Sequence, residues 1–233
     1  MAKRVLITGG AKRIGRHLAL SLAQEGWDVV VHYGHSHEAA ITLKEEIEAL
    51  GQEATLVQGN LQDSQALASI VDQAGKLTAL INNASIFEDI GWEEVTIDDW
   101  NRHLAINLTA PFFLTQQFAK ALEGEGRVVN LLDWRALRPG PDHLPYTISK
   151  SALAALTKSL AQDLAPRITV NALALGAILP PIDGGDPKKV LANVPSKRWA
   201  DLDEVAKSVI FLLEGPSYIT GEIIHLDGGR HLV

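Results

Sequence analysis

The sequence of 233 residues contains no cysteine, and this absence removes several classes of chemistry at once. Without cysteine the chain forms no disulfide, offers no thiolate nucleophile and builds no cysteine-based zinc site. Proteins of the cytosol rarely contain disulfides, so the absence is consistent with that compartment and we expect a cytoplasmic protein.

Long hydrophobic runs are also absent. A short apolar run follows Lys3 and Arg4, but Gly9 and Gly10 end it well before the length of a signal-peptide core. No other stretch is long enough to span a bilayer, so we expect no membrane partner.

Positive charge is not in surplus either, because 21 Lys and Arg residues stand against 28 Asp and Glu residues, which gives a formal net charge of −7 at pH 7. Nucleic-acid-binding proteins usually display a clustered basic surface, so DNA and RNA are not expected partners. With 46% hydrophobic and 21% charged residues the composition is that of a packed globular protein. The length suits one large domain, residues 1–233.

Short apolar, β-branched segments alternate with helical patterns along the chain. This alternation predicts a doubly wound (Rossmann) α/β fold with a parallel sheet and helices on both faces. Gly26 and Gly51 are expected to end the first two helices, and longer helices are expected over residues 98–122 and 146–164. Seven strands are expected, over residues 4–8, 27–33, 54–58, 78–82, 127–132, 168–173 and 222–226.

One segment departs from this alternation. Residues 179–200 are rich in Pro, Gly and Lys and follow the carboxyl end of the sixth expected strand. Ligands of open α/β sheets bind outside those strand ends, and no second core follows the segment. We therefore predict a mobile lid over the active site at residues 179–200.

The turn between the first strand and the first helix reads Thr-Gly-Gly-Ala-Lys-Arg-Ile-Gly over residues 8–15. Backbone N–H groups and the positive end of a helix hold a pyrophosphate at such a turn, although a purely structural tight turn uses the same glycines. The position in the first strand-turn-helix unit favours a dinucleotide. The candidate contacts are Thr8, Gly9, Lys12, Arg13, Ile14 and Gly15.

The end of the second strand indicates which dinucleotide binds. A carboxylate there would bind the ribose 2′-hydroxyl of NAD and repel the additional phosphate of NADP, and no carboxylate directly follows Tyr33. His35 and Ser36 offer donors instead, which favours NADP(H), while Glu38 keeps NAD(H) as an alternative. We expect no metal, because neither a carboxylate nor a cysteine completes a ligand set with the neighbouring histidines.

Tyr146 and Lys150 are four residues apart at the start of a predicted helix, so their side chains share one face. An ammonium group near a phenol favours the phenolate and is expected to lower the pKa of Tyr146 toward neutral pH. Hydride addition to a carbonyl or imine carbon needs a proton at the heteroatom. The pair therefore predicts the proton donor of a reductase, although an exposed surface pair has the same spacing.

Together these motifs resemble those of the short-chain dehydrogenase/reductase family over nearly the whole chain, with Asn82-Asn83-Ala84 after the fourth strand as a further match. The resemblance implies a homotetramer, and it implies that Asn107 holds a water in the proton relay through Lys150. The alternative for Asn107 is an amide that satisfies local backbone. The complete set of further cofactor contacts assigned here is Tyr33, His35, Ser36, Asn60, Leu61, Asn83, Ala84, Ser85, Tyr146, Lys150 and Gly176.

Departures from the usual family pattern make the chain similar to the pteridine reductases. Arg13 stands at the usual middle glycine, and Asp133 stands thirteen residues before Tyr146, where the family usually has its catalytic serine. Asp133 is assigned to the proton relay and to substrate orientation, with a structural carboxylate as the alternative.

The segment Asn-Ala-Ser-Ile-Phe of residues 83–87 resembles the one whose serine and phenylalanine meet the pterin in those reductases. Phe87 is expected to cover one face of a flat ring by offset stacking, although packing against the core is the commoner fate of a phenylalanine. The expected substrate pocket consists of Arg13, Ser85, Phe87, Asp133 and Tyr146.

The C-terminal Gly-Gly-Arg-His-Leu resembles dihydromonapterin reductases, and the resemblance allows Arg230 or His231 to reach a neighbouring subunit's active site. The leading hypothesis is NADPH-dependent reduction of a dihydropterin, of the dihydrobiopterin or dihydromonapterin type, to the tetrahydropterin. A short-chain carbonyl reductase acting on an oxoacyl or sugar substrate is one alternative. A non-catalytic NADP(H)-binding regulator is another, motivated by the missing serine.

Overall fold

A seven-stranded parallel sheet runs through the described residues, 3–180 and 187–233, of this computed structural model. The strand order is β3-β2-β1-β4-β5-β6-β7, so the chain reverses direction across the sheet between β1 and β4. Each expected strand is present, with ends that differ from expectation by at most two residues. The strands are β1 (Arg4–Ile7), β2 (Asp28–Tyr33), β3 (Ala54–Gln58), β4 (Ala79–Asn82), β5 (Gly126–Asp133), β6 (Ile168–Leu175) and β7 (Ile223–Leu226).

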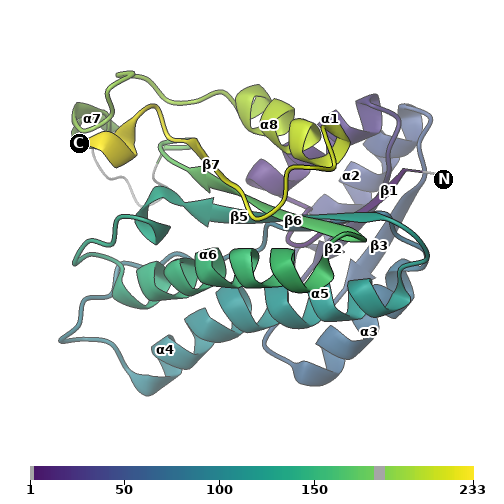
Figure 1. The fold of residues 1–233 in the computed structure, drawn as a ribbon, viewed down its shortest axis with the longest axis horizontal. Coiled ribbons are helices and arrows are strands. Elements are labelled where there is room, and N and C mark those ends of the chain that lie inside the picture. The colour runs from purple at the N-terminus through teal and green to yellow at the C-terminus, as the bar shows by residue number, and fades with distance from the viewer. Residues whose placement is uncertain (1–2, 181–186) are drawn as a thin grey trace.

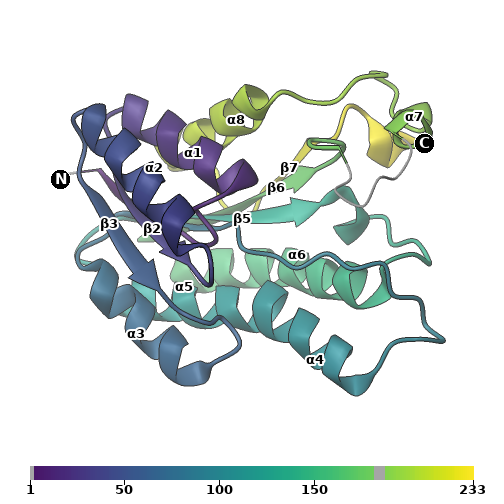
Figure 2. The same ribbon diagram turned by 180° about the vertical axis from the view of Figure 1, so that it is seen from behind.

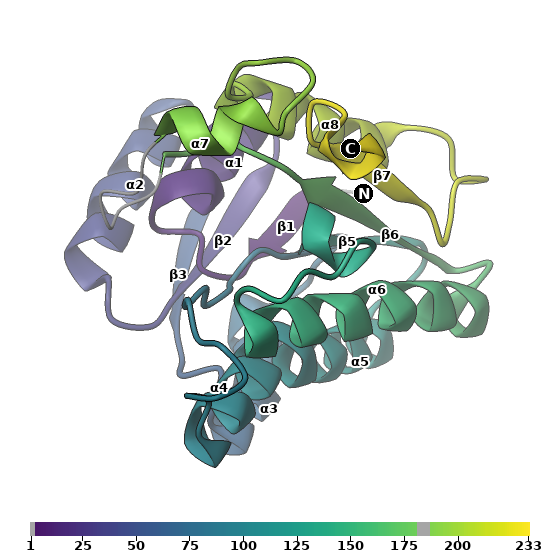
Figure 3. The ribbon, with the colours of Figure 1, turned by 90° about the vertical axis from the view of Figure 1, so that its left-hand side faces the viewer.

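Helices cover both faces of the sheet, which confirms the doubly wound Rossmann fold (Figures 1 and 2). One layer contains α1 (Arg13–Gln24), α2 (His37–Ala49) and α8 (Leu202–Glu214). The other contains α3 (Ser64–Ala74), α4 (Ile97–Leu104), α5 (Ala110–Ala121) and α6 (Leu144–Leu164), as the end view of Figure 3 shows. Among the described residues, no helix combines the length and the apolar character needed to cross a membrane.

Each face of the sheet has its own apolar core. Val5 and Ile7 point into the layer of α1, α2 and α8, whereas Leu6 between them points into the layer of α3 and α5. All three side chains are fully buried. A parallel strand that is covered on both sides has no solvent-facing positions, which explains why these strands are apolar runs without alternation.

The helix expected over residues 98–122 is interrupted by a π-helical turn, Ala105–Thr109, between α4 and α5. Pro111 lies four residues after Asn107 and therefore lacks the N–H that an α-helix would donate to the Asn107 carbonyl. The wider turn accommodates this missing hydrogen bond, and it places Asn107 in the interior.

The expected lid at residues 179–200 lies partly outside the described residues, since 181–186 are not among them. The described part contains a short helix, α7 (Pro187–Ala192), and a connection to α8. Its role as a lid stays a prediction.

Candidate active site

The glycine-rich turn after β1 packs closely against the end of β4. A Cβ atom on Gly9 would lie 3.1 Å from Cα of Ala84, and one on Gly15 would lie 2.5 Å from the Gly9 carbonyl oxygen. Gly9 also has a positive φ of 60°, which glycine adopts without strain. The turn therefore has no space for side chains at these two positions.

Hydrogen bonds join this turn to the end of β4. The Thr8 hydroxyl oxygen accepts from the N–H groups of Asn83 and Ala84, both at 3.0 Å. The Asn83 side-chain amide donates to the carbonyls of Thr8 (2.8 Å) and Gly9 (3.1 Å). Thr8, Gly9, Asn83 and Ala84 were all expected at the cofactor, and the structure brings them together as one hydrogen-bonded unit.

His32 supports the same turn, and the sequence analysis did not identify it as a functional residue. The Gly9 N–H donates to Nδ1 of His32 at 3.2 Å, and Nε2 lies 3.1 Å from the Gly59 carbonyl oxygen. The ring is therefore neutral with its proton on Nε2. Burial lowers the pKa of His32 to about 4, which keeps it in this form. The only signal in the sequence was a histidine inside an apolar strand.

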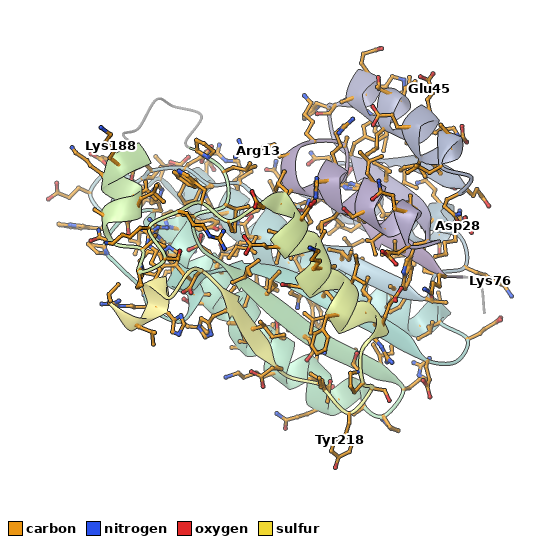
Figure 4. The ribbon with its side chains drawn as sticks, turned by 90° about the horizontal axis from the view of Figure 1, so that it is seen from above. Arg13, Asp28, Glu45, Lys76, Lys188 and Tyr218 are labelled. Carbon is orange, nitrogen blue, oxygen red and sulfur yellow. The ribbon has the colours of Figure 1, made fainter. Side chains whose placement is uncertain are left out.

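Lys12 and Arg13 lie exposed at the start of α1, where Figure 4 labels Arg13. Neither forms an ion pair with any other residue of the described chain. Arg13 has a φ of 52°, in the left-handed region that favours glycine, which explains the glycine of the usual family pattern. Two uncompensated cations beside exposed helix N–H groups suit an anionic phosphate.

The end of β2 also suits a phosphate. The side chains of the exposed His35 and of Ser36, which precedes α2, form no hydrogen bond with any of the described residues. Tyr33 is buried, with its ring in the core and its hydroxyl 2.7 Å from Nδ1 of His37. Its expected contact with the cofactor stays a prediction.

The remaining expected cofactor contacts have structural partners. Asn60 accepts the N–H of Gln62 at 3.0 Å, and Leu61 packs in the core against α3. A Cβ atom on Gly176 would lie 2.5 Å from Cα of Asp227. Ile14 is partly buried against the core at the start of α1.

Tyr146 and Lys150 are both buried on α6, close to the end of β5. The Lys150 ammonium donates to the Leu131 carbonyl at 2.8 Å and lies 5.9 Å from the centroid of the Tyr146 ring. Burial lowers the pKa of Lys150 to about 8, and the Asp133 carboxylate opposes that shift. The surface-pair alternative is therefore wrong.

The expected lowering of the Tyr146 pKa is also wrong. Burial raises the pKa of Tyr146 well above 10, and the neighbouring Asp133 carboxylate raises it further. Arg135 acts in the opposite direction with a smaller effect. The expectation considered only Lys150 and omitted both desolvation and the negative charge that replaces the usual serine. At neutral pH Tyr146 is a protonated phenol.

Asp133 is the last residue of β5 and faces Tyr146, Lys150 and Arg135. Its Oδ1 accepts the Arg135 N–H at 2.9 Å and lies 3.5 Å from the Arg135 guanidinium. Burial raises the pKa of Asp133, because these partners only partly offset the loss of water. A carboxyl group of raised pKa beside a phenol is suited to exchange a proton with it.

Asn107 is fully buried in the π-helical turn, and both ends of its side-chain amide are occupied. The oxygen accepts from the Ser85 hydroxyl (3.1 Å) and the Ile86 N–H (3.0 Å). The nitrogen donates to the Ile86 carbonyl (3.1 Å) and the Ser149 hydroxyl (3.0 Å). The side chain thus positions the segment after β4, and the water-holding role implied for this residue stays a prediction.

Phe87 lies at the rim of the site with 53% of its surface exposed. Its ring meets Tyr146 edge-on, with centroids 4.7 Å apart, and stacks on His143 at 4.1 Å. One face of the Phe87 ring is thus covered by His143, and Cζ of Arg135 lies 5.7 Å from the centroid of the same ring. The sequence analysis missed His143.

The expected pocket residues are only partly brought together. Phe87 and Asp133 both lie against Tyr146, and Asn107 links Ser85 to Ser149, whose hydroxyl donates to the Tyr146 carbonyl. Arg13 lies on the phosphate-binding turn, and no contact joins it to that group among the described residues. The arrangement provides a buried phenol as proton donor and, at the turn after β1, an anion-binding site that suits a dinucleotide.

Comparisons with known proteins agree with this geometry. The sequence profile of the family described as enoyl-(acyl carrier protein) reductase matches residues 9–231. A 3-oxoacyl-[acyl-carrier-protein] reductase from Synechocystis sp. is 33% identical over 238 residues, with 98% of this chain and 96% of that protein covered.

Solved structures are similar over the whole chain. FolM alternative dihydrofolate reductase 1 from Brucella canis, complexed with NADP, has a TM-score of 0.91 and 36% identity, over 99% of this chain and 95% of that chain. A short-chain dehydrogenase/reductase from Serratia marcescens has a TM-score of 0.93 and 31% identity, over 99% and 98% of the two chains.

Proposed function

Since the chain belongs to the short-chain dehydrogenase/reductase family, we propose that it is an NADPH-dependent reductase and that its substrate is a dihydropterin. The observation that carries the substrate class is the carboxylate of Asp133 beside the phenol of Tyr146, below the half-exposed ring of Phe87. The similarity to FolM alternative dihydrofolate reductase 1 supports it.

The residues present fit NADPH. The glycine turn has no space for side chains at residues 9 and 15, and the exposed cations Lys12 and Arg13 lie beside it without ionic partners in the described chain. His35 and Ser36 offer free donors for the additional phosphate at the end of β2. Glu38, in the first turn of α2, is the first acidic residue after the end of β2, and it is the reason that NAD(H) is an alternative cofactor. Neighbouring structures that hold NADP or NADPH support the choice of NADP(H).

When bound, the cofactor supplies a hydride to the carbon of a C=N or C=O bond. Tyr146 donates its proton to the heteroatom of that bond, because it stays protonated at neutral pH. Asp133, with its raised pKa, returns a proton to Tyr146 and orients the substrate through hydrogen bonds. The buried Lys150 ammonium offsets the charge of Asp133 during this exchange.

Dihydropterin reduction is tested by the NADPH absorbance at 340 nm with 7,8-dihydrobiopterin and dihydromonapterin, with NADH as the cofactor control. We expect both pterins to be reduced, and we expect Asp133→Ala to reduce the rate by about a hundredfold, as for loss of a proton-transfer group. Asp163→Asn, an exposed carboxylate at the end of α6, is the matched control and should change nothing. Absence of activity on both pterins would disprove the proposed substrate class.

A carbonyl reductase acting on an oxoacyl substrate is the second candidate, and similarity to 3-oxoacyl-[acyl-carrier-protein] reductases favours it. Phe87→Ala separates the two candidates. A flat pterin loses the ring that covers it, so its kcat/KM should fall by about tenfold, whereas reduction of acetoacetyl-CoA should change little. The non-catalytic regulator is the least supported alternative, and NADPH binding without oxidation in the presence of any of these substrates would favour it.

A further inference from the structure

A row of stacked side chains leads from Tyr146 toward the C-terminal segment. The Phe87 ring meets Tyr146 edge-on, and Cζ of Arg135 lies 5.7 Å from the centroid of the Phe87 ring. Cζ of Arg135 and Cζ of Arg230 lie 4.9 Å and 4.3 Å from the centroid of the Trp134 ring. The sequence analysis did not identify Arg135 or Trp134, and it considered Arg230 only for a neighbouring subunit.

A cavity of about 240 Å³ lies at the outer end of this row. Trp134, Arg138 and Arg230 line it, together with residues from the loop after α7 and from the C-terminal end. Trp134, which lines the cavity, directly follows Asp133 in the chain. The volume of the cavity accommodates the charged end of a substituent.

The two arginines that line this cavity form no ion pair within the described chain, although Asp133, Asp142 and Asp227 partly offset the charge of Arg230. Arg135 contacts Asp142 at 2.6 Å and Asp133 at 3.5 Å, but within the described chain no carboxylate pairs with Arg138 or Arg230. Arg138 donates to the Arg230 carbonyl at 3.4 Å, which keeps the two side chains on one wall. Burial, and next the charge of Arg135, lower the pKa of Arg230, so a bound anion would relieve repulsion there.

Two donor groups of residues that line this cavity also have no acceptor. Nε1 of Trp134 and Nε of Arg230 are buried without a hydrogen-bond partner. Both groups can only donate, so only an acceptor satisfies them. Buried polar groups are nearly always paired in native proteins, so an anionic ligand toward which Trp134 and Arg230 turn would supply the missing acceptors.

We propose that this cavity is a subsite for the negatively charged end of the substrate, where Arg138 and Arg230 bind a carboxylate or phosphate group. The proposal rests on the proposed function, because it places the reacting group at Tyr146 and the substituent along the stacked row. It makes a pterin with an anionic side chain, such as dihydrofolate, a better substrate than one with a neutral side chain.

The subsite is tested without any reaction by calorimetry on the NADPH-loaded protein. The probes are N-(4-aminobenzoyl)-L-glutamate, which carries the carboxylates of a folate without the pterin, and inorganic phosphate. We expect at least one probe to bind, and we expect its Kd to rise about tenfold in Arg138→Gln and in Arg230→Gln. Lys158→Gln, an exposed position on α6, is the matched charge control. No binding to wild type, or equal binding to all variants, would overturn the proposal.

Kinetics then connect the subsite to the substrate. In Arg138→Gln the KM of dihydrofolate should rise about tenfold with kcat nearly unchanged, and the KM of the neutral dihydrobiopterin should stay constant. Arg230→Lys keeps the charge and should retain most of the preference. Equal changes for both substrates would overturn the subsite while dihydropterin reduction itself stands.

The anion subsite and the proposed dihydropterin reduction can be disproved independently of each other. Arginine-dependent binding of the glutamate probe without reduction of any dihydropterin would support the subsite and disprove the function. Arginine-dependent reduction of an oxoacyl group on acyl carrier protein, but not on the CoA thioester, would overturn the small-molecule subsite in favour of a docking surface for an acidic protein.

Discussion

The carboxylate of Asp133 is mostly buried at the end of β5, and burial raises its pKa despite the nearby Arg135 and Lys150. A carboxyl whose pKa is higher in the folded than in the unfolded chain stabilises the fold below the unfolded pKa. That stability is lost as the pH rises through the folded pKa. At neutral pH the charged form of Asp133 therefore lowers the stability of the fold, which is typical of a group retained for function.

Replacement Asp133→Asn should consequently raise stability and lower activity. The amide keeps an oxygen that accepts the Arg135 N–H, Asp142 still pairs with Arg135, and the buried charge is gone. We expect Tm at pH 7 to rise by about 2–4 °C, which corresponds to roughly 1 kcal/mol in a chain of this size. Calorimetric scans at pH 7 and pH 3.5 check this, because the gain should shrink at the lower pH. A lower Tm at pH 7 would show that the carboxylate is structural.

His32 is a second residue whose charge state affects the stability of the fold. Its Nδ1 accepts the Gly9 N–H, and protonation would place a donor against that donor. Because its pKa is lowered to about 4 from 6.5, the stability it provides is complete above pH 6.5 and is lost as the pH falls through about 4.

His32→Leu should weaken NADPH binding and remove this pH dependence. The change leaves the Gly9 N–H and the Gly59 carbonyl without their partner, which costs about 1–3 kcal/mol. We expect the Kd of NADPH to rise about tenfold, measured by fluorescence titration. Urea unfolding between pH 4 and pH 7 gives the second readout, with the exposed His35→Leu as the control for loss of an imidazole. An unchanged slope of stability with pH in His32→Leu would contradict this role.

At the scale of elements, the turn between β1 and α1 is held by its neighbours rather than by its own sequence alone. Thr8 and Asn83 join it to the end of β4, and His32 joins it to β2 and the end of β3. The chain reverses across the sheet between β1 and β4, and open α/β sheets bind their ligands at that point.

Gly15→Ala should therefore abolish NADPH binding, because the added methyl group would lie 2.5 Å from the Gly9 carbonyl oxygen and 2.7 Å from the Asn83 side-chain nitrogen. Gly34→Ala is the matched control, since its Cβ would meet no atom closer than 4.0 Å. We expect NADPH titration to show no binding for the first variant and wild-type affinity for the second. Tight binding by Gly15→Ala would mean that the turn shifts at little cost.

At the scale of the whole molecule, cofactor binding is coupled to folding, because the phosphate-binding turn and the reaction site exist only in the native chain. A ligand present at 100 times its Kd stabilises the native state by about 2.7 kcal/mol. We expect NADPH to raise Tm more than NADH at equal concentration, in thermal scans. The difference should shrink in a Lys12→Ala, His35→Ala double variant, which removes donors but no buried group. Equal shifts for both cofactors would contradict the preference for NADPH.

The homotetramer stays a prediction of the family resemblance. Exposed apolar side chains lie on the outer layer, with Phe113 on α5 and Ile148 on α6 exposed to 41% and 37%. Light scattering measures the assembly directly, and a monomer would contradict the prediction.

Much of this protein was determined by the sequence by itself. Apolar runs without alternation indicate strands that are covered on both faces, and glycines at residues 9 and 15 indicate a turn without space for side chains. The spacing of Tyr146 and Lys150 placed both on one face of a helix, because helical geometry is local.

The electrostatics and the long-range contacts depend on how distant segments pack together. The pKa of Tyr146 depends on burial and on Asp133, and no local pattern reports desolvation. His32 meets Gly9, and Trp134 meets Arg230, across separations of 23 and 96 residues that only the packed chain closes. Spacing along the chain predicts neighbours within one helix or one turn, whereas the charge and donors around a buried group come from whichever distant segments pack against it.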